Sequence, residues 1–418
     1  MHSHINEPYS ELFYYYYDNR RKKYRDIWVG DDSMKKVLFV INTLGCAGAE
    51  TALIELLRTM DKDAYEISLY VLMGQGEMID KIPENVKVLN DHYCRDSVLS
   101  KQGKQAMIKT VWKSFWKNGR ELSKFAYMVR TYSAMQKKGK IQPDKILWRV
   151  VSDGSPRLQE TYDLAVAYLE GGSTYYVAEH VKAKKKVAFV HIDYESSGYT
   201  KAMDRNCYDK IDRIFTVSDE VKKHFLNFYP KYQDKVMVFH NIINQEAIIE
   251  KAEEGQGFTD AFDGIRLLTV GRLNYQKAYD IAIDAMKRIK DAGYKARWYI
   301  LGEGSERNSL EKKVKELGLE KEFLMPGAVS NPFPYYKQAD IYVHATRFEG
   351  KSIAIQEAQT LGCAIVASDC NGNREQIIHG EDGLLCKLDP KSIADSIISL
   401  IDDKEKRRKI SEAARKKD

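Results

Sequence analysis

The sequence predicts an α/β protein built from two doubly wound, parallel-sheet domains in tandem. Its 418 residues exceed what one compact core usually holds, and its 44% hydrophobic and 30% charged residues are ordinary for a globular protein. Short β-rich runs alternate with helix-length segments, and these runs are apolar on both faces, as are strands of a parallel sheet covered by helices. A polar segment without a strand pattern, residues 241–264, separates two such series.

Nine runs are expected to form the strands. Those of the first domain are residues 37–41, 66–72, 163–168, 186–191 and 213–218. Those of the second domain are residues 265–271, 296–302, 340–346 and 363–368. Doubly wound sheets bind ligands at the carboxyl ends of their strands, so we expect the active site there, in the cleft between the two domains.

The pattern divides the chain into three parts. Residues 1–33 are predicted to be an N-terminal appendage, because the run that starts at Met34 reads like a natural first strand. An N-terminal Rossmann-like domain on the acceptor side should cover residues 34–250, and a C-terminal Rossmann-like domain should cover residues 251–418.

The composition argues against several classes of protein. No apolar run approaches the roughly 18 residues of a membrane span, and the N-terminus lacks the basic-then-apolar order of a signal peptide. The six cysteines form neither a CxxC pair nor a Cys/His cluster with zinc spacing. We therefore expect a cytoplasmic protein that needs no cofactor and no metal.

The loop after the first strand offers a backbone that a ligand could approach. It holds Gly45 and Gly48 among small residues and leads into a strongly patterned helix, whose first N–H groups attract anions. A dinucleotide-binding loop would have the spacing GxGxxG and an acidic residue at the end of the second strand, and this sequence has neither. A plain strand–helix turn is the alternative interpretation.

Two cations follow the first strand of the second domain. Arg272 and Lys277 lie where the next helix begins, and the helix dipole repels each of them by roughly 0.3–1 kcal/mol unless an anion lies between. A diphosphate would reverse that sign, whereas solvated surface charges would need no ligand. The turn at Gly302, after the following strand, also permits a close backbone contact.

The most informative stretch covers residues 344–369. Ser352 should cap a short helix that begins at Ile353. Glu349 lies in the loop before that helix, and Glu357 lies within it. A phosphate at the helix start would repel both carboxylates, so we expect them to face hydroxyl groups on either side of a diphosphate. Such a ligand is a nucleotide sugar.

An ATPase P-loop is a rival interpretation of part of this stretch. Residues 345–352 imitate that motif with Ala345 in place of its first glycine, and Asp369 could hold magnesium. Against this interpretation, Glu349 would press its charge into the phosphate cradle. The loop also lies deep in the second domain rather than after a first strand.

The motifs, in this order, resemble the retaining nucleotide-sugar glycosyltransferases of glycosyltransferase family 4, whose fold is the two-domain GT-B arrangement. The similarity covers most of residues 35–400 and is densest from 265 to 380. Ala278 stands where the family usually has glycine, and Lys351 stands where it usually has phenylalanine. The second departure suggests a different selectivity for the donor sugar.

The resemblance implies a role for each candidate residue. Arg272 and Lys277 would bind the donor diphosphate. Glu349 would approach the donor sugar, and Glu357 the ribose hydroxyls. The histidine of FVHIDY, His191, would face the donor sugar, although a histidine that ends a strand is often structural. The expected catalytic residues are His191, Arg272, Lys277 and Glu349, and further donor-binding positions are Gly48, Gly302, Ser352 and Ile353.

The implied activity is transfer of a sugar from a nucleoside diphosphate to an acceptor hydroxyl, with the anomeric configuration kept. The leaving phosphate itself would accept the proton, and no metal would be required. We expect a role in bacterial surface polysaccharide or glycolipid synthesis, with a sugar or lipid-linked sugar as acceptor. The alternative is a catalytically weak sugar-nucleotide-binding or partner-binding protein on the same fold. Family members usually end in a helix that returns to the first domain, and we expect none in this sequence.

Residues 95–140 form a basic amphipathic segment. They hold twelve Lys/Arg against two acidic residues. Two apolar rows recur at i+4 spacing, one of them Ile108, Trp112 and Trp116, and a row of lysines lies on roughly the opposite side of the same helix. Residues 101–124 are therefore predicted to meet an anionic membrane, which would make the protein peripheral on the inner face of the cell membrane. Packing of both rows on the first domain is the alternative, and nucleic acid is disfavoured because no recognised binding motif accompanies the charge.

Overall fold

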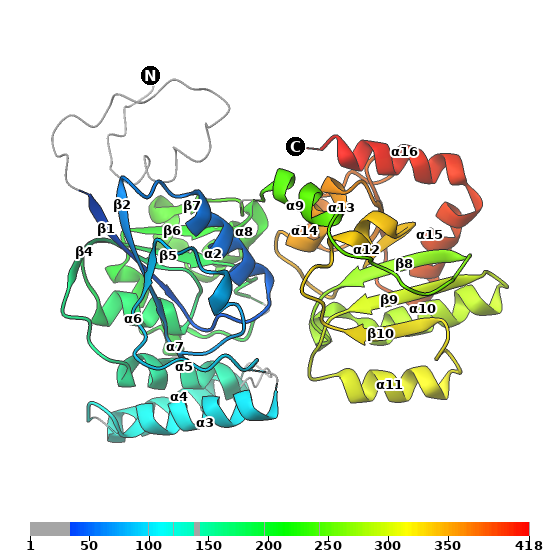
Figure 1. The fold of residues 1–418 in the computed structure, drawn as a ribbon. Coiled ribbons are helices and arrows are strands. Elements are labelled where there is room, and N and C mark those ends of the chain that lie inside the picture. The colour runs from blue at the N-terminus through cyan, green and yellow to red at the C-terminus, as the bar shows by residue number, and fades with distance from the viewer. Residues whose placement is uncertain are drawn as a thin grey trace. The chain divides into compact units, whose positions relative to one another are not determined.

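The computed structural model describes residues 34–98, 100–119, 121–137, 143–195, 197–241 and 243–417. The predicted appendage, residues 1–33, lies outside the described residues. From Lys35 onward the chain forms one compact unit that contains two parallel sheets (Figure 1).

The first sheet has seven strands in the order β3-β2-β1-β4-β5-β6-β7. All five strands predicted for this half are confirmed. The two edge strands, β3 and β7, were not predicted, because three residues are too few to show an apolar pattern. The strands are β1 (Lys35–Ile41), β2 (Tyr65–Val71), β3 (Val86–Val88), β4 (Thr161–Ala167), β5 (Lys182–Val190), β6 (Arg213–Thr216) and β7 (Val236–Val238).

The second sheet has six strands in the order β10-β9-β8-β11-β12-β13. Its four central strands are those predicted, and the edge strands β10 and β13 are again additional. The strands are β8 (Ile265–Val270), β9 (Ala296–Leu301), β10 (Phe323–Gly327), β11 (Ile341–His344), β12 (Ala364–Ser368) and β13 (Leu384–Cys386).

Helices follow most strands, as expected for doubly wound sheets. In the first half they are α2 (Gly48–Thr59), α3 (Lys101–Trp116), α4 (Glu121–Lys137), α5 (Pro143–Gly154), α6 (Gly172–His180), α7 (Lys201–Asp204) and α8 (Asp219–Phe228). Further along they are α9 (Gln245–Ala252), α10 (Tyr279–Asp291), α11 (Arg307–Glu316), α12 (Phe333–Gln338), α13 (Ile353–Thr360), α14 (Asn371–Arg374), α15 (Pro390–Asp402) and α16 (Lys404–Arg415). No helix in these described ranges is both long and apolar enough to cross a membrane.

Each sheet has its own apolar core. Val40, Ala167 and Val190 are fully buried in the first, and Ile300 and Val366 in the second. Because β8, β9 and β11 run parallel, the loops that follow them emerge at one edge of the second sheet. These loops carry most of the residues predicted to bind the donor.

Candidate active site

A short 3-10 helix, η4 (Tyr275–Lys277), organises the loop after β8. The Asn274 side chain accepts a hydrogen bond from the Lys277 backbone N–H at 3.2 Å and so caps this turn. Ala278 then adopts a left-handed conformation with φ of 48°. An L-residue in this region is strained by roughly 1–2 kcal/mol, which is a physical reason why glycine would be favoured at this position.

Lys277 and Glu349 form an ion pair between the loops after β8 and β11. Their side chains are only 16% and 15% exposed. The Glu349 carboxylate is also 3.3 Å from His344 Nε2 and accepts a hydrogen bond from Gln276 Nε2 at 3.3 Å. Glu349 therefore lies at the centre of a polar cluster and orients the ammonium group of Lys277.

This cluster fixes the charge of Glu349. Burial alone would raise the pKa of Glu349, but the Lys277 ammonium and the His344 ring outweigh burial and lower its pKa to about 2. The carboxylate is therefore anionic at neutral pH. The sequence motifs predict that Lys277 contacts a diphosphate and that Glu349 contacts a sugar. In the structure the two side chains contact each other.

Arg272 has different surroundings from Lys277. Its side chain is exposed, and it forms no ion pair with any residue that the structure describes. Its charge does act on the carboxyl group of Glu50 near the start of α2. Burial raises the pKa of Glu50 to about 7, and Arg272 opposes that rise. Arg272 is thus a cation available to an anionic ligand.

The start of α13 is not capped by a side chain. Ser352 occupies the N-cap position, as predicted, but its hydroxyl makes no capping hydrogen bond. Gln376 instead holds the Ser352 backbone, accepting from its N–H at 2.6 Å and donating to its carbonyl at 2.8 Å. The first N–H groups of α13, beginning at Ile353, therefore remain available to a ligand.

Replacing Ser352 with alanine is expected to leave the free energy of unfolding within ~0.5 kcal/mol of the wild-type value, because no cap is lost. Ser218→Ala is the matched comparison. The Ser218 hydroxyl accepts from Val221 N–H at 3.2 Å at the start of α8, so its loss should destabilise by about 1 kcal/mol. Urea unfolding of both variants measures the contrast, and equal losses would contradict it.

Glu357 lies one turn into α13, in apolar surroundings. It accepts a hydrogen bond from Tyr336 Oη at 3.0 Å. Burial raises the pKa of Glu357 to about 7, against the smaller effect of the Tyr336 hydroxyl. A carboxylate without a neighbouring cation among the described residues suits a ligand that donates hydroxyl groups, as predicted for a ribose.

Replacing Glu357 with glutamine is expected to stabilise the folded protein at pH 8 and to weaken nucleotide binding. Because the pKa of the folded state lies above the ordinary value of 4.5, the stability contributed by Glu357 is present below pH 4.5 and lost as pH rises through about 7. Glutamine avoids that loss, for a gain of ~1–2 kcal/mol at pH 8 and little at pH 4. Urea unfolding at both pH values checks this, with the exposed Glu381→Gln as control; a gain of equal size at both pH values would contradict the titration.

His191 follows the carboxyl end of β5 and is held by its backbone. Its N–H donates to Glu170 Oε2 at 3.0 Å, and its ring packs against Tyr168 at 5.2 Å between centroids. Burial lowers the pKa of His191 to about 4, so the ring is neutral at pH 7. Its Nε2 is buried without a hydrogen-bond partner in the described chain, which leaves that atom for a ligand hydroxyl.

The two candidate glycines differ in what requires them. A Cβ on Gly302 would lie 1.9 Å from the Gly271 carbonyl oxygen, so the close approach of two strand ends already explains that glycine. A Cβ on Gly48 would lie 3.5 Å from Ile353 Cδ1, which is ordinary van der Waals contact. The chain itself thus does not require glycine at position 48, and a ligand there could.

The P-loop interpretation finds no support in these contacts. Asp369, which would hold magnesium, pairs with Arg374 at 2.5 Å. The Thr346 hydroxyl donates to the carbonyl oxygens of Gln276 and Phe348, both at 3.0 Å. The loop before α13 is therefore closed onto η4 rather than open as a phosphate cradle.

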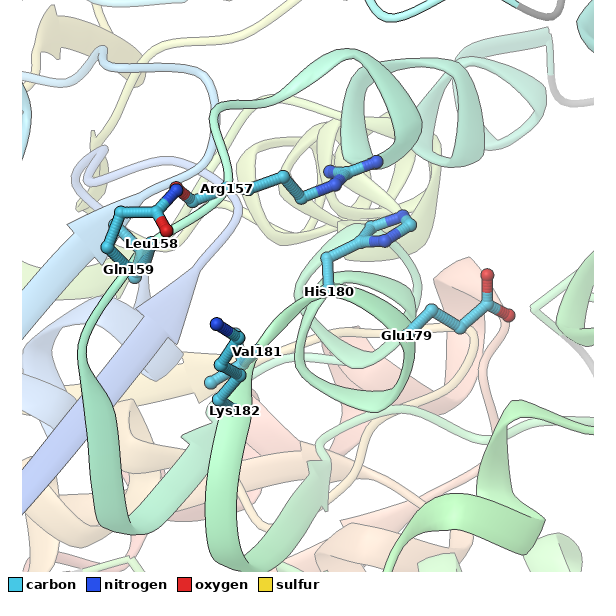
Figure 2. Close-up of a pocket in the computed structure, with 7 residues that line it drawn as sticks. All are labelled: Arg157, Leu158, Gln159, Glu179, His180, Val181 and Lys182. Carbon is cyan, nitrogen blue, oxygen red and sulfur yellow. The ribbon is translucent and has the colours of Figure 1, made fainter.

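A cavity of about 280 Å³ in the first half of the chain lies away from these residues. Figure 2 shows its lining, which comes from the loop before β4 and from the junction of α6 and β5. Lys182 begins β5 and His191 follows its end, about 30 Å away at ~3.3 Å per residue. The lining residues are Arg157, Leu158, Gln159, Glu179, His180, Val181 and Lys182.

Two clusters of described side chains could offer three ligand atoms to a metal ion. Both are already held by contacts within the chain. Glu179 pairs with Arg149 at 2.8 Å, and His224 pairs with Glu195. Neither cluster includes a predicted donor-binding residue. The clusters are Asp153 with Glu179 and His180, and Asp193 with Glu195 and His224.

Sequence reasoning missed the partners that orient the site. The sequence motifs assign no role to His344, yet it lies between Tyr342 Oη at 3.1 Å and Glu349. Tyr336 and Gln376 were not considered. The one signal for His344 was its place as the last residue of a strand, five residues before Glu349.

Residues 259–417 match the family model of glycosyl transferases group 1. Two relatives come from Campylobacter jejuni. One, an N-acetylgalactosamine-N,N'-diacetylbacillosaminyl-diphospho-undecaprenol 4-alpha-N-acetylgalactosaminyltransferase, is 32% identical over 44% of this chain and 48% of its own length. The other, a GalNAc-alpha-(1->4)-GalNAc-alpha-(1->3)-diNAcBac-PP-undecaprenol alpha-1,4-N-acetyl-D-galactosaminyltransferase, is 22% identical over 92% of this chain and 94% of its own length.

The chain spans about half the length of the first curated relatives that it matches. Among solved structures, Anabaena HepE in complex with UDP and glucose covers 91% of this chain and 94% of its own, with a TM-score of 0.63 and 17% identity. At that identity the likeness concerns the fold. The two-sheet architecture and the likeness to HepE agree that the chain has the GT-B fold, and its second half matches the family model of glycosyl transferases group 1.

Proposed function

We propose that this protein is a retaining, metal-independent glycosyltransferase of the family 4 type. It would move a sugar from a nucleoside-diphosphate sugar to a hydroxyl of a sugar or lipid-linked sugar. The observation that carries the proposal is the grouping of the Lys277–Glu349 pair, the exposed Arg272 and the uncapped start of α13 in loops at one edge of the second sheet.

In this proposal, the chain's own groups stabilise the leaving diphosphate. Arg272 and the first N–H groups of α13 face the charge that grows as the bond from the sugar C1 to the diphosphate oxygen breaks. Fixed donors of this kind commonly contribute about 3–4 kcal/mol. The acceptor oxygen bonds to C1 on the face that the diphosphate leaves, and its proton passes to a leaving phosphate oxygen.

Glu349, His191 and Glu357 would orient the donor rather than exchange protons. Glu349 holds Lys277 toward the diphosphate and offers its second oxygen to a sugar hydroxyl. The neutral ring of His191 presents Nε2, which lacks a partner in the described chain, to another sugar hydroxyl. Glu357 accepts from the ribose, and Tyr336 keeps its carboxylate in place.

The names of the relatives suggest the kind of acceptor. Both Campylobacter jejuni proteins are named for diphospho-undecaprenol substrates. We propose a comparable lipid-linked sugar here, used in bacterial surface polysaccharide or glycolipid synthesis on the cytoplasmic side of the cell membrane. Donor nucleotide and sugar would be set by residues around Glu357 and Lys351.

Calorimetric titration of the full chain with UDP, GDP, ADP, NAD and ATP–Mg tests the proposal. Selective binding of one nucleoside diphosphate in EDTA is expected. Binding of ATP only with magnesium would favour the P-loop instead, and no binding of any of the five would contradict the proposed function. Once the donor is known, the anomeric proton coupling of the product by NMR decides between retention and inversion.

A further inference from the structure

Exposed apolar side chains are concentrated on α3 and α4. Thirteen large hydrophobic side chains are exposed in the described part of the chain, and seven of them lie on these two helices. Leu122 is 87% exposed and Trp112 67%. The seven are Ile108, Trp112, Trp116, Leu122, Phe125, Val129 and Tyr132. Clusters of this kind on a protein surface mark interaction sites.

The apolar stripe of α4 lies on the face opposite its buried side. Leu122, Phe125, Val129 and Tyr132 recur at three- and four-residue spacing, which places them on one helix face. The buried face consists of Lys124, Tyr127, Thr131 and Met135. An apolar stripe of this kind is ordinarily buried, whereas on α4 it faces solvent. The sequence pattern did not predict this exposed stripe.

The apolar rows of α3 divide between two roles. Met107, Val111 and Phe115 are half-buried and pack toward the domain, so the packing alternative holds for that row. Trp112 and Trp116 are exposed. Together with residues of α4 and α5, the α3 rows line an apolar groove of about 360 Å³, whose other lining residues are Ile108, Met128, Leu147 and Val150.

The exposed apolar face is bordered by positive charge. Lys109 and Lys113 on α3, and Lys117 at its C-cap, are exposed and come one position after Ile108, Trp112 and Trp116 respectively. Residues 95–140 hold twelve Lys/Arg and two acidic residues. A protein partner would have to supply many carboxylates around an apolar centre, whereas an anionic bilayer presents both chemistries over a wide area.

The two helices are held together and fixed to the domain. The Lys124 ammonium donates to the carbonyl oxygens of Ser114 at 2.8 Å, Phe115 at 2.9 Å and Lys117 at 2.7 Å, and so caps the end of α3. The α3–α4 pair lies beside α5 (Figure 1). A Cβ on Gly154 of α5 would lie 2.3 Å from the Ser114 carbonyl oxygen. The exposed stripe is therefore presented by a preformed hairpin.

We propose that the α3–α4 hairpin is a docking surface for an anionic lipid bilayer. The stripe from Leu122 to Tyr132 and the ring of Trp112 enter the boundary between headgroups and acyl chains, and a lipid hydrocarbon chain occupies the groove beside Trp112. The lysine row of α3 meets the anionic headgroups. This inference rests on the proposed function for the identity of the acceptor, and it adds the part of the chain that reaches the membrane.

Flotation of the full-length protein with vesicles tests the proposal. Wild type should float with phosphatidylcholine vesicles that contain 30% phosphatidylserine at least tenfold more than with pure phosphatidylcholine vesicles. Leu122→Ser with Phe125→Ser should lower flotation by on the order of tenfold. Met237→Ser with Ile249→Ser removes side chains of similar exposure, 47% and 48%, and should leave flotation unchanged.

Charge provides a second arm. Lys109→Glu with Lys113→Glu should lower flotation about as strongly, and 0.5 M salt should do the same. Equal binding to neutral and anionic vesicles, or flotation that survives the Leu122/Phe125 change, would overturn the proposal. So would capture of an acidic protein partner through this face without any vesicle binding.

Nucleotide titration separates this proposal from the proposed function. Variants of α3 and α4 that still bind the nucleoside diphosphate and keep the wild-type melting temperature are folded, so their loss of flotation reports on docking. Wild type that binds nucleotide but ignores anionic vesicles refutes the docking surface alone. Wild type that floats but binds no nucleotide refutes the proposed transfer and leaves the docking surface standing.

Discussion

Replacing Lys277 with methionine is expected to lower the rate of sugar transfer by ~10²–10³-fold, the loss typical when a fixed group facing a developing negative charge is removed. Two effects combine. In the proposed reaction the diphosphate would lose a cation, and Glu349 would lose the ion pair that orients it. With the ammonium gone, burial should raise the pKa of Glu349 above about 2, while the His344 ring still opposes that rise.

The matched control is Lys287→Met, on the exposed face of α10, where Lys287 pairs with Asp291. Transfer rates at saturating donor and acceptor measure the effect, and the melting temperature shows whether the variant folds. A second variant, Lys277→Arg, keeps the charge but not the geometry and should recover part of the rate. If Lys277→Met and Lys287→Met turn over equally fast, Lys277 has no part in the reaction.

Replacing Gly302 with alanine is expected to lower the free energy of unfolding by about 3 kcal/mol, the upper end of what overpacking costs. The added Cβ would lie 1.9 Å from the Gly271 carbonyl oxygen. Because that neighbour is backbone rather than a flexible side chain, β8 and β9 would have to separate at their carboxyl ends. Urea unfolding measures the loss.

Gly48→Ala is the contrasting variant. Its Cβ would meet Ile353 at an ordinary 3.5 Å, so stability should change by less than ~0.5 kcal/mol. If Gly48 faces the donor phosphates, nucleotide affinity should still fall. Equal destabilisation by both alanines would show that the nearest contact of each added Cβ does not decide its effect on stability.

The central strands of both sheets are predictable from the sequence for a physical reason. A strand buried on both faces is a continuous apolar run, and nine such runs are where the structure has strands. Edge strands lack that signal. The edge strands β3, β7 and β13 have only three residues each. They form strands because they pair with neighbouring strands, and the sequence pattern of three residues does not predict that pairing.

The residue types at the site are also predictable, but their partners are not. Lys277 and Glu349 are 72 positions apart, and they meet because β8 and β11 are neighbours in the sheet. Each motif taken by itself predicts that its side chain contacts the ligand, and neither motif predicts that Lys277 and Glu349 contact each other. Ser352 shows the same limit: serine at a helix start predicts a cap, whereas Gln376, 24 residues later, takes over the local hydrogen bonds.

The place of β4 in the first sheet governs how the chain assembles. The Lys36 backbone N–H of β1 donates a hydrogen bond to Oδ2 of Asp163, within β4, at 2.9 Å and across 127 residues. Closing a loop of that length costs about 4 kcal/mol in chain entropy. During synthesis, β1 can pair with β2 early, but its other edge stays unpaired until β4 has been made and pairs with it. Refolding from denaturant should be slow for the same reason, and the exposed edge of β1 is where chains would pair wrongly with one another.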